Sequence, residues 1–151
     1  MSDVLTQYHQ YADGILTQLK PENRTKLARE IAKKIREHNR KRIVAQVDPD
    51  GASFIPRKKQ RLRAKKGHIR RKMFSKIRTT KYLKINANAN SASVSFIDAV
   101  SRIAKAHHFG LRDRVNDHVD TIYPKRQLLG INNADLMMVE QLTLSHLARN
   151  L

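Results

Sequence analysis

A block of positive charge constrains this chain of 151 residues more than any other feature of its sequence. Residues 57–78 hold 12 Lys and Arg residues and no Asp or Glu. Like charges at this density repel one another, so the segment should be extended or loosely helical until an acidic surface or a polyanion neutralises it. The block is either a solvated basic linker or an interaction segment, and runs of this size favour interaction.

The rest of the chain differs electrostatically from this region. Of the 31 Lys and Arg residues, 24 lie in residues 20–84, and the formal net charge of the whole chain is +18. Outside that range seven basic groups meet eight acidic ones. If the block binds a polyanion, phosphate neutralisation would drive the binding. The residues expected to take part are Lys58, Lys59, Arg61, Arg63, Lys65, Lys66, Arg70, Arg71 and Lys72.

Length and composition exclude several classes of protein. The chain suits one domain with an appendage, and its apolar runs are too short for a membrane-spanning helix. No basic-then-apolar signal segment follows the polar N-terminus, which argues against secretion and for synthesis in a cytoplasm. The absence of cysteine removes disulfides, thiolate metal sites and cysteine nucleophiles.

Hydrophobic periodicity predicts an α+β fold, with a small, mostly antiparallel sheet and packed helices behind a long helical N-terminal arm. The arm has two helices, at 3–19 and from Pro21 to about Val47, separated because a residue before proline disfavours helical angles. Asp48-Pro49-Asp50-Gly51 is a turn signal. We divide the chain into this arm (1–48), a basic loop with a short helix (49–80) and an α+β core (81–151).

Within the core, alternation predicts strands at 83–87, 92–96 and 118–123, with a strand continuing through Leu128 to Gly130. A short helix is expected around Met73 to Ile77. Another helix at 97–108 should bury Ile103 and end at Gly110 as a left-handed cap. Asn132 or Asn133 should cap the last helix, which should bury Leu136.

No catalytic pattern is visible. The seven histidines form no recognised ligand pattern, and adjacent His107 and His108 point apart on a helix. The glycines form no phosphate-binding loop. Asp48 and Asp50 are expected to bond their own turn rather than act as a carboxylate pair. We therefore expect no enzyme activity, no cofactor and no metal.

Several strings occur in an order and spacing that resembles a known family. They are Asn39-Arg40-Lys41-Arg42-Ile43, Gln46, Pro49-Asp50-Gly51, Phe54-Ile55-Pro56-Arg57-Lys58, Gly67 to Phe74, Ala106-His107-His108-Phe109-Gly110 and Tyr123 to Gly130. Together they resemble the phage virion morphogenesis family, the tail completion proteins of temperate contractile-tailed phages, of the protein S type. The resemblance covers residues 25–150.

The resemblance implies a structural protein that completes the head-proximal end of a phage tail and enables head-tail joining. Its partners would be phage tail and neck proteins, with a homo-oligomeric ring expected to have six subunits, contact with DNA through the basic block, and no membrane. The residues expected at interfaces or in family motifs are Arg40, Arg42, Asp50, Gly51, Pro56, Arg57, His107, Phe109, Gly110, Pro124, Arg126 and Gly130. Arg126 is placed on a strand rim, where an interface would use it. Arg40, Arg42 and Arg57 are expected to make charge-assisted contacts within the subunit or across an interface. For each of the residues above, local folding and an interface are equal alternatives, except that local folding is favoured for the glycines.

Two alternatives remain at this point. The chain could be a charge-driven, sequence-independent nucleic-acid-binding protein, because the basic block contains one aromatic residue, Phe74, and so encodes no base stacking. The arm at 3–19 could pack on its own domain or on another copy.

Overall fold

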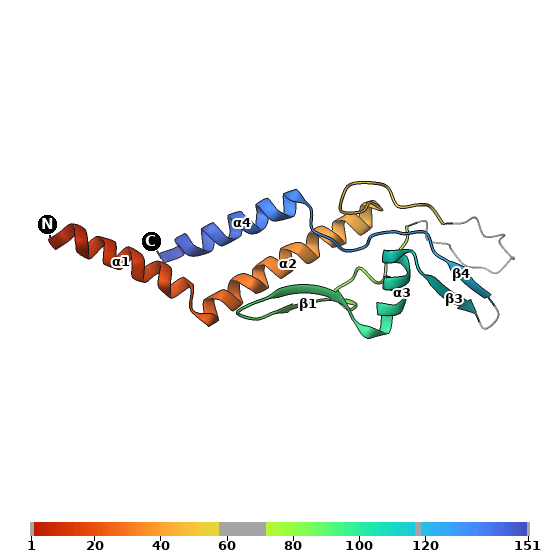
Figure 1. Cartoon of the computed structure of the whole chain (residues 1–151), viewed down its shortest axis with the longest axis horizontal. Coiled ribbons are helices and arrows are strands. Elements are labelled where there is room, and N and C mark those ends of the chain that lie inside the picture. The colour runs from red at the N-terminus through yellow and green to blue at the C-terminus, as the bar shows by residue number, and fades with distance from the viewer. Residues whose placement is uncertain (1, 58–71, 117–118, 151) are drawn as a thin grey trace. The chain divides into compact units, whose positions relative to one another are not determined.

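The computed structural model describes residues 2–57, 72–116 and 119–150. In chain order the helices are α1 (Ser2–Gln18), α2 (Pro21–Ala45), α3 (Asp98–Phe109), α4 (Asn133–Leu147) and a short 3-10 helix, η1 (Ala148–Asn150). The strands are β1 (Leu83–Ala87), β2 (Ala92–Phe96), β3 (Arg112–Asn116) and β4 (Val119–Ile122). Figure 1 shows the helical arm that precedes the strands, and the predicted α+β class is confirmed.

The strands form two separate antiparallel ribbons of two strands each, rather than one sheet. The chain divides into two compact units built from discontinuous segments. Unit 1 contains α1, the first part of α2, the β1–β2 tip and the chain from Ile131, which includes α4. Unit 2 contains residues 38–84 and 96–130. Each unit is described below by itself.

The hydrophobic core of unit 2 gathers side chains from distant parts of the sequence. Its buried members are Ile43, Phe54, Met73, Ala104 and Leu128. Phe74, Ile77 and Phe96 pack against them, with Phe54 and Phe74 in an edge-to-face arrangement. This core fixes the end of α2, the loop after it and one side of α3 against one another, because buried apolar surface is the main favourable term in folding.

Two helix ends were predicted from local signals and are confirmed. Gly110 adopts a left-handed conformation with φ 70° and ends α3, where glycine has no Cβ penalty. At the start of α4, the Asn132 side chain accepts a hydrogen bond from the Asp135 backbone N–H. Asp135 in turn accepts from the Asn132 N–H, which completes a capping box.

Other expectations for local structure are wrong. Residues 73–78 form turns, not a helix, because Phe74 has a positive φ of 62°, which no α-helix accommodates. No strand runs from Leu128 to Gly130. Strand β3 was not expected, and it pairs with the predicted strand β4 across a bulge. Ile103 and Leu136, expected inside, are exposed.

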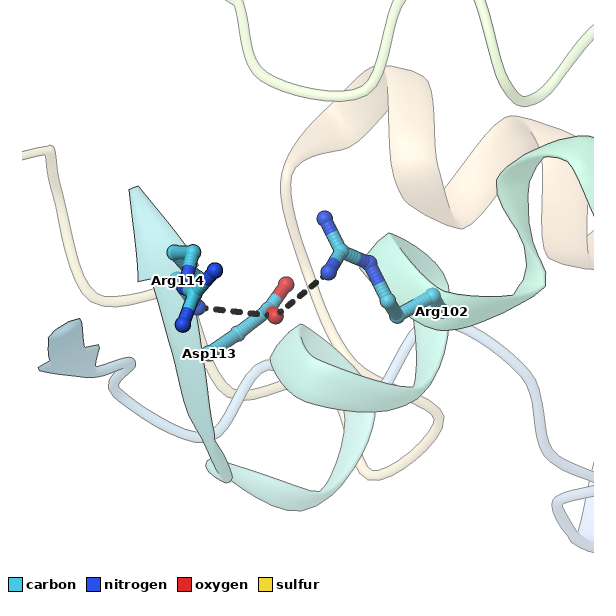
Figure 2. A network of polar contacts seen from close by, with 3 residues as sticks. All are labelled: Arg102, Asp113 and Arg114. Atoms are coloured by element: carbon cyan, nitrogen blue, oxygen red, sulfur yellow. Dashed lines mark hydrogen bonds and ion pairs between the residues drawn. The ribbon is translucent and has the colours of Figure 1, made fainter. Parts of the chain in front are cut away.

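Asp113 connects β3 to α3 (Figure 2). Its Oδ1 atom lies 3.4 Å from Arg102 Nη1 of α3 and accepts a hydrogen bond of 2.8 Å from the Arg114 backbone N–H. The Arg102 side chain is largely exposed, so this ion pair adds little free energy on its own. It adds a polar contact between α3 and β3, which both belong to unit 2.

None of the described helices is long and apolar enough to cross a bilayer.

Candidate functional site

Three of the motif strings meet at one buried side chain, Arg126. Only 4% of this residue is exposed. Its Nε atom donates to the Ile55 carbonyl at 2.7 Å, and Nη2 donates to the Pro56 carbonyl at 3.2 Å. The remaining terminal nitrogen, Nη1, lies 3.2 Å from His107 Nδ1. The guanidinium fork therefore joins segments about 70 residues apart, a geometry that lysine does not reproduce.

His107 is the second component of this arrangement, which we call the Arg126 cluster (Ile55, Pro56, Phe74, His107, Tyr123 and Arg126). The imidazole packs against Phe74 and Tyr123, with ring centroids 4.9 and 4.3 Å away. The backbone adds a further bond, from the Arg126 N–H to the His107 carbonyl at 2.7 Å. Because arginine only donates, His107 Nδ1 must be an unprotonated acceptor.

The electrostatics of the cluster agree with a neutral imidazole. Burial, reinforced by the positive charges of Arg126 and Arg57, lowers the pKa of His107 to about 4. Asp113 opposes this shift weakly. Burial and the charge of Arg57 also lower the pKa of Arg126. Near neutral pH the cluster therefore contains one buried cation that is bound by carbonyl oxygens and a neutral ring.

The neighbouring His108 binds the same segment after β4 at a different residue. Its Nδ1 atom accepts a hydrogen bond from the Leu128 N–H at 3.3 Å, and its ring contacts Phe109. Burial, then the charge of Lys125, lowers the pKa of His108. Both histidines are thus hydrogen-bond acceptors that hold the 123–130 segment against α3.

Two side chains of α2 bind the backbone of Gly130. Its N–H donates to Asn39 Oδ1 at 2.9 Å, and its carbonyl accepts from Arg42 Nη2 at 2.7 Å. A Cβ at this position would overlap the Pro49 ring. Gly130 is therefore required for close packing rather than for an unusual φ. Arg42 makes its charge-assisted contact within the subunit, one of the two alternatives left by the sequence.

Gln46 is a structural residue whose role the sequence analysis did not identify. Its φ is 61°, so it ends α2 in a left-handed conformation, with Val47 N–H bonded back to the Arg42 carbonyl at 3.1 Å. Its side-chain amide binds the backbone of Met73: it accepts a hydrogen bond from the Met73 N–H at 2.8 Å and donates one to the Met73 carbonyl at 3.0 Å. Only its place among the family-like strings distinguished it in the sequence.

In the turn after α2, Asp48 makes the side-chain bonds. Its Oδ1 atom accepts from the N–H groups of Asp50 and Ala52 at 3.0 and 2.8 Å. Gly51 has a positive φ of 88°. The expected turn bonding is thus present in Asp48, while Asp50 is exposed.

Arg126 is not on a strand rim: it lies outside the strands, buried and bound inside unit 2, which is the local-folding alternative. Around it, several of the predicted interface residues are accessible: Pro56, Arg57 and Phe109 are exposed, and Phe109 is 60% exposed. His107, Gly110 and Pro124 are half-buried, as are Arg40 and Arg42.

The structure describes the basic block (57–78) at Arg57 and from Lys72 to Arg78. Arg57, Lys72 and Lys76 are exposed, and Arg78 is half-buried. The expected polyanion-binding residues Lys58, Lys59, Arg61, Arg63, Lys65, Lys66, Arg70 and Arg71 lie outside the described residues.

The chemistry available at the Arg126 cluster is binding. Its polar groups are engaged with one another, and the cluster contains no nucleophile beside a general base. Within residues 2–57, 72–116 and 119–150, no three His, Asp or Glu side chains are grouped as metal ligands. What the cluster does is hold an exposed loop, Ile55 to Arg57, beside α3.

Comparisons with known proteins agree with the motif strings. The chain matches the phage virion morphogenesis family over residues 3–148. It is 39% identical over 138 residues to Tail completion protein S of Escherichia phage P2, an alignment that covers 90% of this chain and 92% of that protein. No solved structure shows a significant match.

Proposed function

The chain belongs to the phage virion morphogenesis family, and from this membership we propose that it completes the head-proximal end of a phage tail and enables the tail to join a filled head. The observation that carries the proposal is the 39% identity to Tail completion protein S, which extends over nearly the full length of both chains. A structural role in phage tail assembly follows from the family, and the head-proximal position is the more specific part of the proposal.

The proposed partners are phage tail and neck proteins, within the virion and after synthesis in the host cytoplasm. The exposed side chains of the loop held by Arg126, Ile55 and Arg57, combine apolar area with charge, as binding surfaces do. We propose that this loop meets a tail or neck protein. The Arg126 cluster would then act by presenting the loop in one conformation, which lowers the entropic cost of binding.

A homo-oligomeric ring, with six subunits as the expected number, is part of the proposal. Each of the two described ribbons has only two strands, so all four strands have an unpaired edge. Isolated two-stranded ribbons are marginally stable in water, and unpaired edges accept further strands. Both properties support association with other chains.

Disruption of the gene in the phage tests the proposed role. Electron microscopy of the lysate should show filled heads and separate tails, with few complete virions. Supplying the intact gene from a plasmid should restore complete virions. Normal numbers of virions from the disrupted phage would reject the role, and a lysate without assembled tails would place the protein at an earlier step.

A second candidate function, contact with the DNA backbone, is supported by α2. Lys26, Arg29 and Lys33 lie exposed on one face of this helix, at spacings of three and four residues. Successive members are therefore about 4.5 and 6 Å apart along the axis. Such a row can neutralise successive phosphates without reading the base sequence.

The salt dependence of DNA binding tests this candidate. Replacing Lys26, Arg29 and Lys33 together with Gln should reduce the slope of log K against log salt by about 2–3, since each phosphate contact contributes about 0.9. The matched control is Lys105→Gln, an exposed lysine on α3. An unchanged slope in the triple variant would remove α2 from any DNA contact.

A further inference from the structure

The first helix has no covering surface along most of its length. Residues 5–13 of α1 are exposed throughout, and burial begins only near its end, at Gln18. An isolated helix of this length is marginal in water, so α1 needs a second surface to be stable. Its contacts inside unit 1 are with α4 and η1.

The uncovered residues form a continuous apolar stripe. Leu5, Tyr8, Ala12, Leu16 and Leu19 recur at spacings of three and four residues, which places them on one helical face. Leu5 is 63% exposed and Tyr8 is 69% exposed. The stripe runs for roughly 20 Å along α1 and its end.

Helix α4 carries a second apolar stripe that nothing in unit 1 covers. Leu136 is 57% exposed, Met137 is 70% exposed and Leu144 is 61% exposed. These residues share one side of the helix, since Leu144 lies eight residues after Leu136 and seven residues after Met137. The opposite side is also apolar, with Val139 and Leu142 half-buried, and a helix that is apolar all round is normally covered on all sides.

The exposed area is large for a single chain. Counting Tyr11 as well, eight large apolar side chains on these two helices expose on the order of 100 Å² each, or roughly 800 Å² together. Five of these side chains are on α1 and its end and three on α4, so the two stripes expose roughly 500 and 300 Å², each comparable with the largest apolar patch of a typical monomer, which is often a functional surface. If one α1 stripe covered one α4 stripe of another copy, the contact with its polar flanks would approach the roughly 1,000 Å² of a specific interface.

Charge indicates which surfaces of a chain with net charge +18 can meet a second copy. Helices α1 and α4 contain no Lys or Arg, whereas α2 contains nine and α3 contains two. Repulsion between copies is therefore smallest at α1 and α4. The absence of Lys and Arg from α1 also argues against a membrane surface, because helices that lie on anionic bilayers are rich in both.

We propose that the α1 stripe of one copy packs on the α4 stripe of a second copy, in a head-to-tail contact that uses a different surface on each partner. This contact specifies how copies would associate in the oligomer of the proposed function. It rests on the proposed function only for the expectation that the protein is an oligomer. It is tested with purified protein, without heads or tails, so its failure and failure of the tail role are distinguishable.

The experiment measures mass by sedimentation equilibrium or light scattering on the full chain and two variants. One variant is Tyr8→Glu with Leu16→Glu on α1, and the other is Leu136→Glu with Leu144→Glu on α4. All four positions are exposed, so the fold outside α1 should be intact, and circular dichroism should show at most the loss of α1 helicity that follows from losing its second surface. The matched control, Gln7→Glu with Gln10→Glu, adds the same charge to the opposite face of α1.

We expect the full chain and the control to associate, and each variant alone to be monomeric. An equimolar mixture of the two variants should form a heterodimer, because one retains α4 and the other retains α1. A monomeric full chain at 100 μM, association of the α4 variant alone, or a mixture that stays monomeric would overturn the proposal. Vesicle binding that the α1 variant loses, with a monomeric full chain, would assign α1 to membranes instead.

Discussion

Single residues in this protein carry contacts that connect distant parts of the chain, and Gln46 is the clearest example. It occupies a left-handed conformation that normally favours glycine, and its amide bridges to Met73. The hydrogen bonds compensate for the conformational cost. The two contributions are separable by substitution.

We expect Gln46→Ala to reduce the free energy of unfolding by about 2–4 kcal/mol, because it removes three hydrogen bonds and keeps a Cβ at positive φ. Gln46→Gly should cost about 1 kcal/mol less than Gln46→Ala, since glycine relieves the backbone strain. Urea unfolding with an unchanged slope checks both values. If the alanine variant proved equal to or more stable than the glycine variant, the strain at this position would be disproved.

His107 makes stability depend on pH. Its pKa is about 4 in the folded protein and 6.5 in a free chain, so the folded state disfavours protonation. The contribution of neutral His107 to the free energy of unfolding is complete above pH 6.5 and is lost progressively as the pH falls to 4. The loss should be on the order of 1–2 kcal/mol, less than the full linkage value, because solvent screens the half-buried ring.

His107→Gln tests this dependence, because the amide can still accept from Arg126 but does not titrate. Urea unfolding at pH 7.5 and pH 4.5 should show a smaller loss of stability in the variant than in the natural chain. His108, whose pKa is also lowered, is present in both proteins and cancels in the comparison. Equal losses would show that His107 is not the group responsible.

At the scale of elements, local sequence signals predicted the ends of helices but not the structure that depends on distant contacts. Pro21 separated α1 from α2, Gly110 ended α3 and Asn132 began α4, because each acts on backbone groups within a few residues. Strand β3 was missed because Arg112, Asp113 and Arg114 show no apolar alternation. The turn at Phe74 was missed because its positive φ depends on contacts with Phe54 and His107, far away in sequence.

The same limit explains the error at Arg126. Arginine is almost always exposed unless it is paired, and its two carbonyl partners lie about 70 residues earlier. The sequence therefore indicated that Arg126 belongs to a motif but not that it is buried. The motif strings did predict the family, because their order and spacing can be recognised in the sequence without knowing which residues are in contact.

The capping box at the start of α4 provides a test at this scale. Asn132→Ala should reduce stability by about 1–2 kcal/mol, since it removes the bond to Asp135 N–H and leaves the buried Asp135 with a less ordered partner. The melting temperature should fall by about 2–4 °C per kcal/mol. Asn132→Ser, which can still cap, should stay close to the natural protein. A serine variant as unstable as the alanine variant would contradict the capping role.

At the scale of the whole molecule, the chain combines a strongly basic region with two helices free of positive charge. Its buried polar cluster is occupied by internal hydrogen bonds, and we propose that the protein acts through surfaces that bind other macromolecules. The exposed loop beside Arg126 and the stripes of α1 and α4 are distinct surfaces.

Joining of heads and tails in a cell-free mixture is the sharpest test of the proposal that this protein enables the tail to join a filled head. Tails from a phage with the disrupted gene are mixed with filled heads, and purified protein is added in increasing amounts. Infectious particles should rise from a low background in proportion to the added protein. Tails that join heads equally well without the protein, or that stay inactive at every concentration of correctly folded protein, would contradict it.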